Sequence, residues 1–180
     1  MNDISLELDR LHTLTGADFI RQLKLIVSCG EFHLVEGEEG IFSVGGEKGE
    51  DYENLLNAAR KAVSHGYQVY ILPNPKGIRT ADFIFVQRGI YKMYDLKTIR
   101  GKSSVMNRLK ESVGQANHVL LNITTDYRAF SLAICIKKYF EINPYAVEVL
   151  VYRGNKSILV KRSSTKRRDF FKTFEKLYNK

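Results

Sequence analysis

The sequence contains no tryptophan, only two cysteines and only three prolines among its 180 residues. Cys29 and Cys135 are far apart in the chain, and neither belongs to a Cys-x-x-Cys or Cys/His motif. This spacing excludes the usual zinc-ligand patterns and a disulfide-rich scaffold. We interpret both cysteines as buried thiols of a protein from a reducing compartment.

Long hydrophobic runs are also missing. No apolar stretch approaches the ~20 residues that a membrane-spanning helix requires. The first ten residues, MNDISLELDR, are acidic and lack the basic flank and apolar segment of a signal peptide. The sequence therefore predicts a cytoplasmic protein, either of the cell that makes it or of a target cell, without a membrane span.

Acidic side chains are scarce after the first third of the chain. Residues 1–53 carry 4 basic and 12 acidic side chains, a net charge of −8, whereas residues 54–180 carry 24 and 8, a net charge of +16. Such an excess of positive charge favours a polyanionic partner, with nucleic acid first and a membrane surface second. The alternative is a basic surface that only confers solubility.

The hydrophobic pattern predicts alternating helices and strands, and hence an α/β fold with a mixed sheet flanked by helices. The predicted helices cover residues 3–12, 16–28, 50–66, 103–117, 126–142 and 166–180. The predicted strands cover residues 32–35, 41–44, 67–73, 81–87, 90–99, 118–123, 146–153 and 157–162. A glycine-rich acidic stretch divides an accessory segment, residues 1–46, from a main domain, residues 47–180, which ends in a hairpin and a basic helix.

The strand IYKMYDLKTI, residues 90–99, carries two opposite charges in alternate positions. Because side chains alternate between the faces of a strand, Asp95 and Lys97 point the same way. A hairpin turn near residues 87–89 then sets Asp82 opposite this pair. Two converging carboxylates repel each other unless a cation lies between them, and Mg²⁺ is commonly held by one or two carboxylates. An ammonium group beside the metal orients or deprotonates the attacking water.

The pattern Asp82…Asp95-Leu96-Lys97, within the order helix, strand, strand, strand, helix, strand, resembles the catalytic core of the PD-(D/E)XK nuclease superfamily. The stretch from KGIRTADF to HVLLNI, residues 76–123, is further similar to toxin nuclease domains at the C-termini of contact-dependent growth inhibition proteins and polymorphic toxins. The resemblance covers about residues 47–123. Ala81 stands where the superfamily often has a proline before the first aspartate.

The resemblance implies a Mg²⁺- or Mn²⁺-dependent endonuclease that acts as a toxin in bacterial competition. RNA is the expected substrate, with tRNA first, and an acidic immunity protein is the expected partner. Asp82 and Asp95 would hold the metal, together with Glu53 from the preceding helix, where Glu50 is the reserve candidate. Lys97 and Gln115, on the strand and on the helix that follows it, would complete the catalytic set.

Two groups of residues are predicted to bind the nucleic acid. The first surrounds the start of the helix after the catalytic strand, where backbone N–H groups and hydroxyls can hold phosphate. It comprises Arg100, Lys102, Ser103, Ser104, Asn107 and Arg108, with Ser112 further along the same helix. The second is the C-terminal helix, in which Lys166, Arg167 and Arg168 accompany a stripe formed by Phe170, Phe171, Phe174 and Leu177.

Several alternatives are compatible with the same residues. Asp95 and Lys97 can form an exposed ion pair of little energetic value. Similar patterns occur in metal-independent toxins classed with the barnase, EndoU, colicin and RelE-like ribonucleases, where His118 would be the first acid/base candidate. The protein can also be a DNA endonuclease, a non-catalytic nucleic-acid-binding module or an interaction protein of a mobile element.

Overall fold

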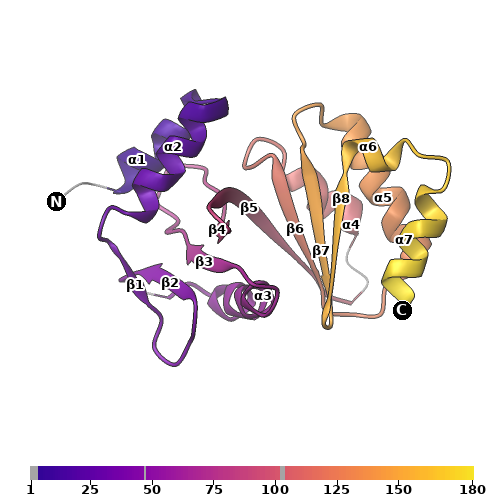
Figure 1. Ribbon diagram of the computed structural model, residues 1–180, viewed down its shortest axis with the longest axis horizontal. Coiled ribbons are helices and arrows are strands. Elements are labelled where there is room, and N and C mark those ends of the chain that lie inside the picture. Colours follow the sequence, from indigo (N-terminus) through magenta and orange to yellow (C-terminus); the bar gives the residue numbers. More distant parts are fainter. Residues whose placement is uncertain (1–3, 47, 102–103) are drawn as a thin grey trace. The chain divides into compact units, whose positions relative to one another are not determined.

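The computed structural model describes residues 4–46, 48–101 and 104–180, and it has the predicted mixed α/β class (Figure 1). The chain divides into two compact units, Met1–Tyr94 and Asp95–Lys180, with the boundary inside strand β5 (Ile90–Ile99). Each unit contains parallel and antiparallel strand pairs, which confirms the predicted mixed pairing. The predicted joint at residue 46 lies within the first unit and stays a prediction.

The first unit pairs its strands in chain order from β1 to β5. Its helical segments are α1 (Ile4–Arg10), η1 (Leu11–Thr13), α2 (Gly16–Val27) and α3 (Tyr52–Ser64), and its strands before β5 are β1 (Phe32–Leu34), β2 (Ile41–Val44), β3 (Gln68–Ile71) and β4 (Phe83–Gln87). Strand β2 runs parallel to β3, with α3 as the crossover between them. The acidic N-terminal segment therefore contributes strands to the sheet that contains β3 and β4.

The second unit continues with the order β5, β6, β7, β8. Its helices are α4 (Val105–Glu111), α5 (Ala129–Ile142), α6 (Arg162–Thr165) and α7 (Phe170–Asn179), and its strands after β5 are β6 (His118–Ile123), β7 (Glu148–Arg153) and β8 (Lys156–Lys161). Strand β6 is parallel to β7, and β7 and β8 form the predicted hairpin. Along Tyr52–Ile123 the order is helix, strand, strand, strand, helix, strand, and its assignment to a nuclease superfamily stays a prediction.

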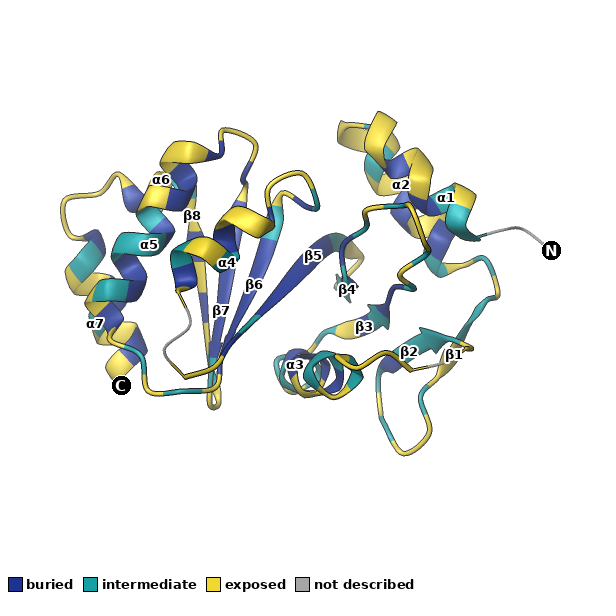
Figure 2. Ribbon diagram, turned by 180° about the vertical axis from the view of Figure 1, so that it is seen from behind, coloured by how far each residue is buried: buried dark blue, intermediate teal, exposed yellow. Residues whose placement is uncertain are grey.

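The core of the second unit lies between the strands and helices α4, α5 and α7. It is formed by alternate residues of β6, β7 and β8, such as Val119, Val149 and Ile158, packed against apolar residues of these helices. Figure 2 shows the buried residues running along β6 and β7 and along the second half of β5. This packing provides a rigid support for side chains that β5 and α4 carry.

Helix α7 differs from its predicted form in two respects. It begins at Phe170, so Lys166, Arg167 and Arg168 lie in the connection after α6 and not on a helix. Its buried side chains are Phe170, Phe174 and Tyr178, whereas Leu177 is exposed. Both sets of positions lie along one side of the helix, and the packing of α7 against α5 and β8 buries the side that includes Tyr178.

No helix in the described ranges is long and apolar enough to cross a membrane.

Candidate active site

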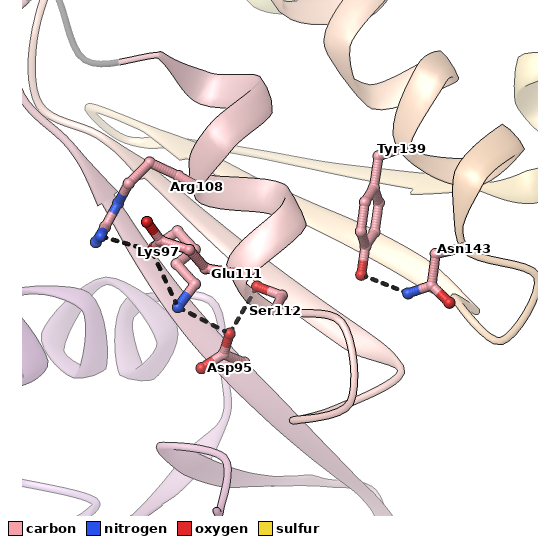
Figure 3. A network of polar contacts seen from close by, with 7 residues as sticks. All are labelled: Asp95, Lys97, Arg108, Glu111, Ser112, Tyr139 and Asn143. Atoms are coloured by element: carbon pink, nitrogen blue, oxygen red, sulfur yellow. Dashed lines mark hydrogen bonds and ion pairs between the residues drawn. The ribbon is translucent and has the colours of Figure 1, made fainter.

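Asp95 and Lys97 lie on β5 and form an ion pair in which lysine Nζ is 3.2 Å from aspartate Oδ2 (Figure 3). Their side chains are only 3% and 9% exposed, respectively. The expectation that the two side chains share a side of the strand is confirmed by this contact, and the alternative of an exposed ion pair is wrong. Since both charges are removed from water, their pairing must offset a desolvation cost of several kcal/mol per ion.

The end of α4 supplies further partners for the pair. The hydroxyl of Ser112 donates a hydrogen bond to Asp95 Oδ2 over 2.6 Å. Lys97 Nζ lies 3.9 Å from Oε2 of Glu111, and the same oxygen is 2.9 Å from the guanidinium nitrogen Nη1 of Arg108. A carboxylate, an ammonium and a second carboxylate therefore form one network, which Ser112 and Arg108 extend at its two ends (Figure 3).

The length of α4 explains why these residues meet. The helix has seven residues and extends for about 10 Å. About three residues of a strand cover the same distance. A helix that starts just after β5 and runs back along it thus brings its last residues over Asp95 and Lys97. Ser112 was expected near the phosphate-binding start of this helix, but it is the C-cap residue and lies beside Asp95.

Tyr139 and Asn143 of the α5 region form a second pair to the right of the network (Figure 3). The side-chain amide of Asn143 donates to the Tyr139 hydroxyl over 3.0 Å, and both residues are buried. Burial raises the pKa of the Tyr139 phenol, the hydrogen bond from Asn143 opposes this shift, and the charge of Asp95 adds to it. The electrostatic effect of Asp95 thus extends to α5. The sequence did not single out Tyr139, because it falls on the apolar stripe of that helix.

Gln115 does not lie on α4, which ends at Glu111 and not at the predicted residue 117. Gly114, with φ of +83°, follows in a turn that a residue with a Cβ adopts only with strain. The backbone N–H of Gln115 donates to the carbonyl of Ser112 over 3.0 Å. The helical position expected for Gln115 is therefore wrong, while its catalytic role stays a prediction.

The residues predicted to bind phosphate at the start of α4 differ in their surroundings. Lys102 and Ser103 lie outside the described residues. Ser104 caps the helix and accepts a hydrogen bond from the backbone N–H of Asn107 over 3.3 Å. Both residues are exposed, as is Arg100 directly after β5. Arg108 is engaged with Glu111, as described above.

Asp82 and Glu53 belong to the first unit, whereas Asp95 and Lys97 belong to the second. Asp82 directly precedes β4, and its backbone N–H donates to the carbonyl of Tyr94 over 3.1 Å. Glu53 is exposed in the first turn of α3, and Glu50 is exposed just before that helix. A metal site that combines these residues with Asp95 stays a prediction.

The number and type of nearby ligand side chains decide which metal ion a site can bind. Among the residues that the structure describes, no three Asp, Glu, His or Cys side chains gather into a metal-binding group. Mg²⁺ nevertheless often uses one or two carboxylates and completes its octahedron with water and substrate phosphate. Asp95 fits such a site as one hard oxygen ligand.

Comparisons with known proteins do not assign the chain to a group. No family model, curated protein or solved structure matches the sequence. The function must therefore be inferred from the Asp95–Lys97 network and from the charge of the chain.

Proposed function

We propose that the protein is an endonuclease that hydrolyses phosphodiester bonds of nucleic acid with Mg²⁺ or Mn²⁺, and that it acts as a toxin. The observation that carries this proposal is the buried contact between the Lys97 ammonium and the Asp95 carboxylate, 3.2 Å apart on β5. A carboxylate can hold a metal ion and an ammonium can stabilise charge on a phosphate, and both groups assist such hydrolysis.

Each side chain has a distinct task in this mechanism. When bound, the metal ion would supply a Lewis acid and a water molecule of lowered pKa. Asp95 would hold that ion, with Asp82 and Glu53 as the further proposed ligands. Lys97 Nζ would donate hydrogen bonds to a phosphate oxygen or to the attacking water. The low exposure of the pair strengthens these interactions because little water screens them.

The charge distribution supports a nucleic-acid substrate. Residues 95–180 carry 18 basic and 7 acidic side chains, a net charge of +11, whereas residues 1–94 carry 10 and 13, a net charge of −3. The candidate site therefore belongs to the strongly basic unit. We take RNA, with tRNA first, as the substrate from the resemblance described above, and DNA as the alternative within the same chemistry.

The basic connection before α7 is expected to contact the phosphate backbone. Lys166, Arg167 and Arg168 are exposed. The Nε and Nη2 atoms of Arg167, however, each donate a hydrogen bond of 3.2 Å to a carboxylate oxygen of Asp169. Replacing Lys166 and Arg168 by glutamine should weaken binding to all sequences alike. Each lost contact should reduce the slope of log K against log salt by about 0.7–0.9. Fluorescence anisotropy with labelled RNA at several salt concentrations measures this slope.

A matched variant controls for the loss of net charge. Lys48 and Lys76 are exposed lysines of the first unit, and their replacement by glutamine removes the same charge from elsewhere. If the Lys166/Arg168 variant keeps the wild-type slope, or if both variants change it equally, the connection before α7 is not part of the binding surface.

Expression in cells tests the toxin assignment. We expect the wild-type protein to stop growth of a host that lacks an inhibitor, whereas the Lys97→Ala variant should accumulate without harm. An acidic immunity protein is the expected inhibitor, since it would complement the basic unit and associate rapidly in low salt. Free expression of the wild type, with intact nucleic acid in the lysate, would contradict this assignment.

The burial of the pair favours one second candidate, a nucleic-acid-binding module without catalysis. In that case Asp95 and Lys97 would only stabilise the contact between β5 and α4. Such a module would bind RNA or DNA with the same salt dependence but would leave both intact in the presence of Mg²⁺ or Mn²⁺.

A further inference from the structure

Two consecutive residues at the end of α4 hold the two members of the catalytic pair. Ser112 contacts Asp95, and Glu111 lies next to Lys97. We propose that both are positioning residues: Ser112 orients the Asp95 carboxylate toward a divalent cation, and Glu111 keeps the Lys97 ammonium in the site once that cation is bound. This inference rests on the proposed nuclease function and assigns tasks to residues outside the predicted catalytic set.

Ser112 has the geometry of a fixed donor. It is fully buried, and its hydroxyl is 2.6 Å from Asp95 Oδ2, a distance typical of a hydrogen bond to a charged oxygen. Its backbone is anchored as well, because its N–H donates to Leu109 and its carbonyl accepts from Gln115. A donor with so little freedom restricts the rotation of the carboxylate to which it binds. Mutation of a residue that hydrogen-bonds to a metal ligand commonly lowers metal affinity by about 10–100-fold.

Glu111 offers Lys97 a second carboxylate. Lys97 Nζ is 3.2 Å from Asp95 Oδ2 and 3.9 Å from Glu111 Oε2, so the ammonium lies between two negative groups. A divalent cation on Asp95 would repel the ammonium. Glu111 is then the carboxylate toward which Nζ can shift while it remains in the site. Arg108, 2.9 Å from the same glutamate oxygen, keeps Glu111 oriented.

The first test measures metal binding in the absence of substrate. Mn²⁺ binding to the full chain is followed by electron paramagnetic resonance for the wild type, Ser112→Ala and a control, Ser131→Ala, which removes a hydroxyl from α5. We expect Ser112→Ala to bind Mn²⁺ about tenfold more weakly and to need correspondingly more Mg²⁺ for half-maximal cleavage, while the control is unchanged. A folded Ser112→Ala protein with Mn²⁺ affinity within twofold of the wild type overturns the role of Ser112.

A second variant keeps the test valid if Ser112→Ala does not fold. Ser112→Cys keeps a donor atom on Cβ but replaces the hydroxyl by a larger thiol that is a much weaker donor. We expect its Mn²⁺ affinity to fall at least threefold, and an unchanged affinity overturns the role of Ser112. A wild-type protein that binds no Mn²⁺ and cleaves nothing overturns the proposed function itself, and this inference with it. If the wild type cleaves normally, an unchanged Mn²⁺ affinity of the Ser112 variants contradicts only the role of Ser112 and not the proposed function.

The second test separates the task of Glu111 from that of Ser112. Glu111→Gln is compared with Glu141→Gln, which neutralises an exposed carboxylate on α5. We expect kcat for Glu111→Gln to fall about tenfold and Mn²⁺ affinity to stay unchanged, because the variant weakens the contacts of Oε2 with Lys97 and Arg108 but leaves Asp95 intact. A kcat equal to that of the Glu141→Gln control overturns the role of Glu111.

Discussion

Asp95→Asn and Lys97→Met should each slow the cleavage of nucleic acid by ~10³-fold or more. Asparagine keeps the shape of aspartate but loses the charge that would hold a divalent cation. Methionine keeps most of the length of the lysine but cannot donate to a phosphate or to water. Single-turnover measurements with saturating protein isolate the chemical step, so that weaker binding does not enter the comparison.

Controls for this prediction come from the same unit. Glu141→Gln and Lys138→Met change exposed residues of α5 and should cleave at rates close to that of the wild type. Circular dichroism of all four variants shows whether the fold is kept. If either Asp95→Asn or Lys97→Met is folded and retains activity within tenfold of the wild type, the assignment of the site is wrong.

A large loss of stability is expected when only one member of the pair is removed. Lys97→Met leaves the Asp95 carboxylate buried without its ammonium partner, and this should lower the free energy of unfolding by about 3–5 kcal/mol. The double variant Asp95→Asn/Lys97→Met removes both charges and should regain most of that loss. A double-mutant cycle by urea denaturation measures the coupling between the two residues.

The cycle also tests the burial of the pair. Exposed ion pairs typically contribute about 0.2–1 kcal/mol. The loss of unfolding free energy expected for a buried pair is therefore several-fold larger than that for an exposed pair. Because the chain has two units, the variants are compared only on the unfolding transition that they shift. Single variants that lose less than about 1 kcal/mol would show that this pair, whose side chains are 3% and 9% exposed, contributes no more to stability than an exposed ion pair.

The contact between Asp95 and Lys97 could be predicted because it depends only on the alternation of side chains in one strand. Its burial could not, since that depends on which elements cover β5. The partners from α4 were missed for a related reason. The sequence RLKESVGQAN continues a helical pattern past Glu111 and therefore predicts a helix to residue 117.

A geometric signal for the end of α4 was nevertheless present. Gly114 interrupts the pattern, and a helix of about seven residues returns along about three residues of the preceding strand. Counting back from Ile99 leads to the region of Asp95 to Lys97. Ser112 and Glu111 could thus have been placed near the pair from element lengths alone. The hydrogen bond of Ser112 depends on side-chain packing, which element lengths do not determine.

Helix α7 illustrates a different limit. The choice between Leu177 and Tyr178 as the buried residue depends on the rotation of the helix about its axis. Four apolar residues at positions 170, 171, 174 and 177 define one stripe, but positions 170, 174 and 178 define another that is nearly as apolar. Contacts with α5 and β8 select the second stripe, and the sequence of α7 alone does not contain this information.

The central claim is that the chain hydrolyses nucleic acid with a divalent cation at the Asp95–Lys97 site. The most direct measurement incubates the purified protein with tRNA and with supercoiled plasmid, in Mg²⁺ or Mn²⁺ and again after addition of EDTA. We predict cleavage of tRNA that stops in EDTA and returns when excess Mg²⁺ is added. Intact tRNA and plasmid in both metals, or cleavage that continues undiminished in EDTA, would contradict the claim.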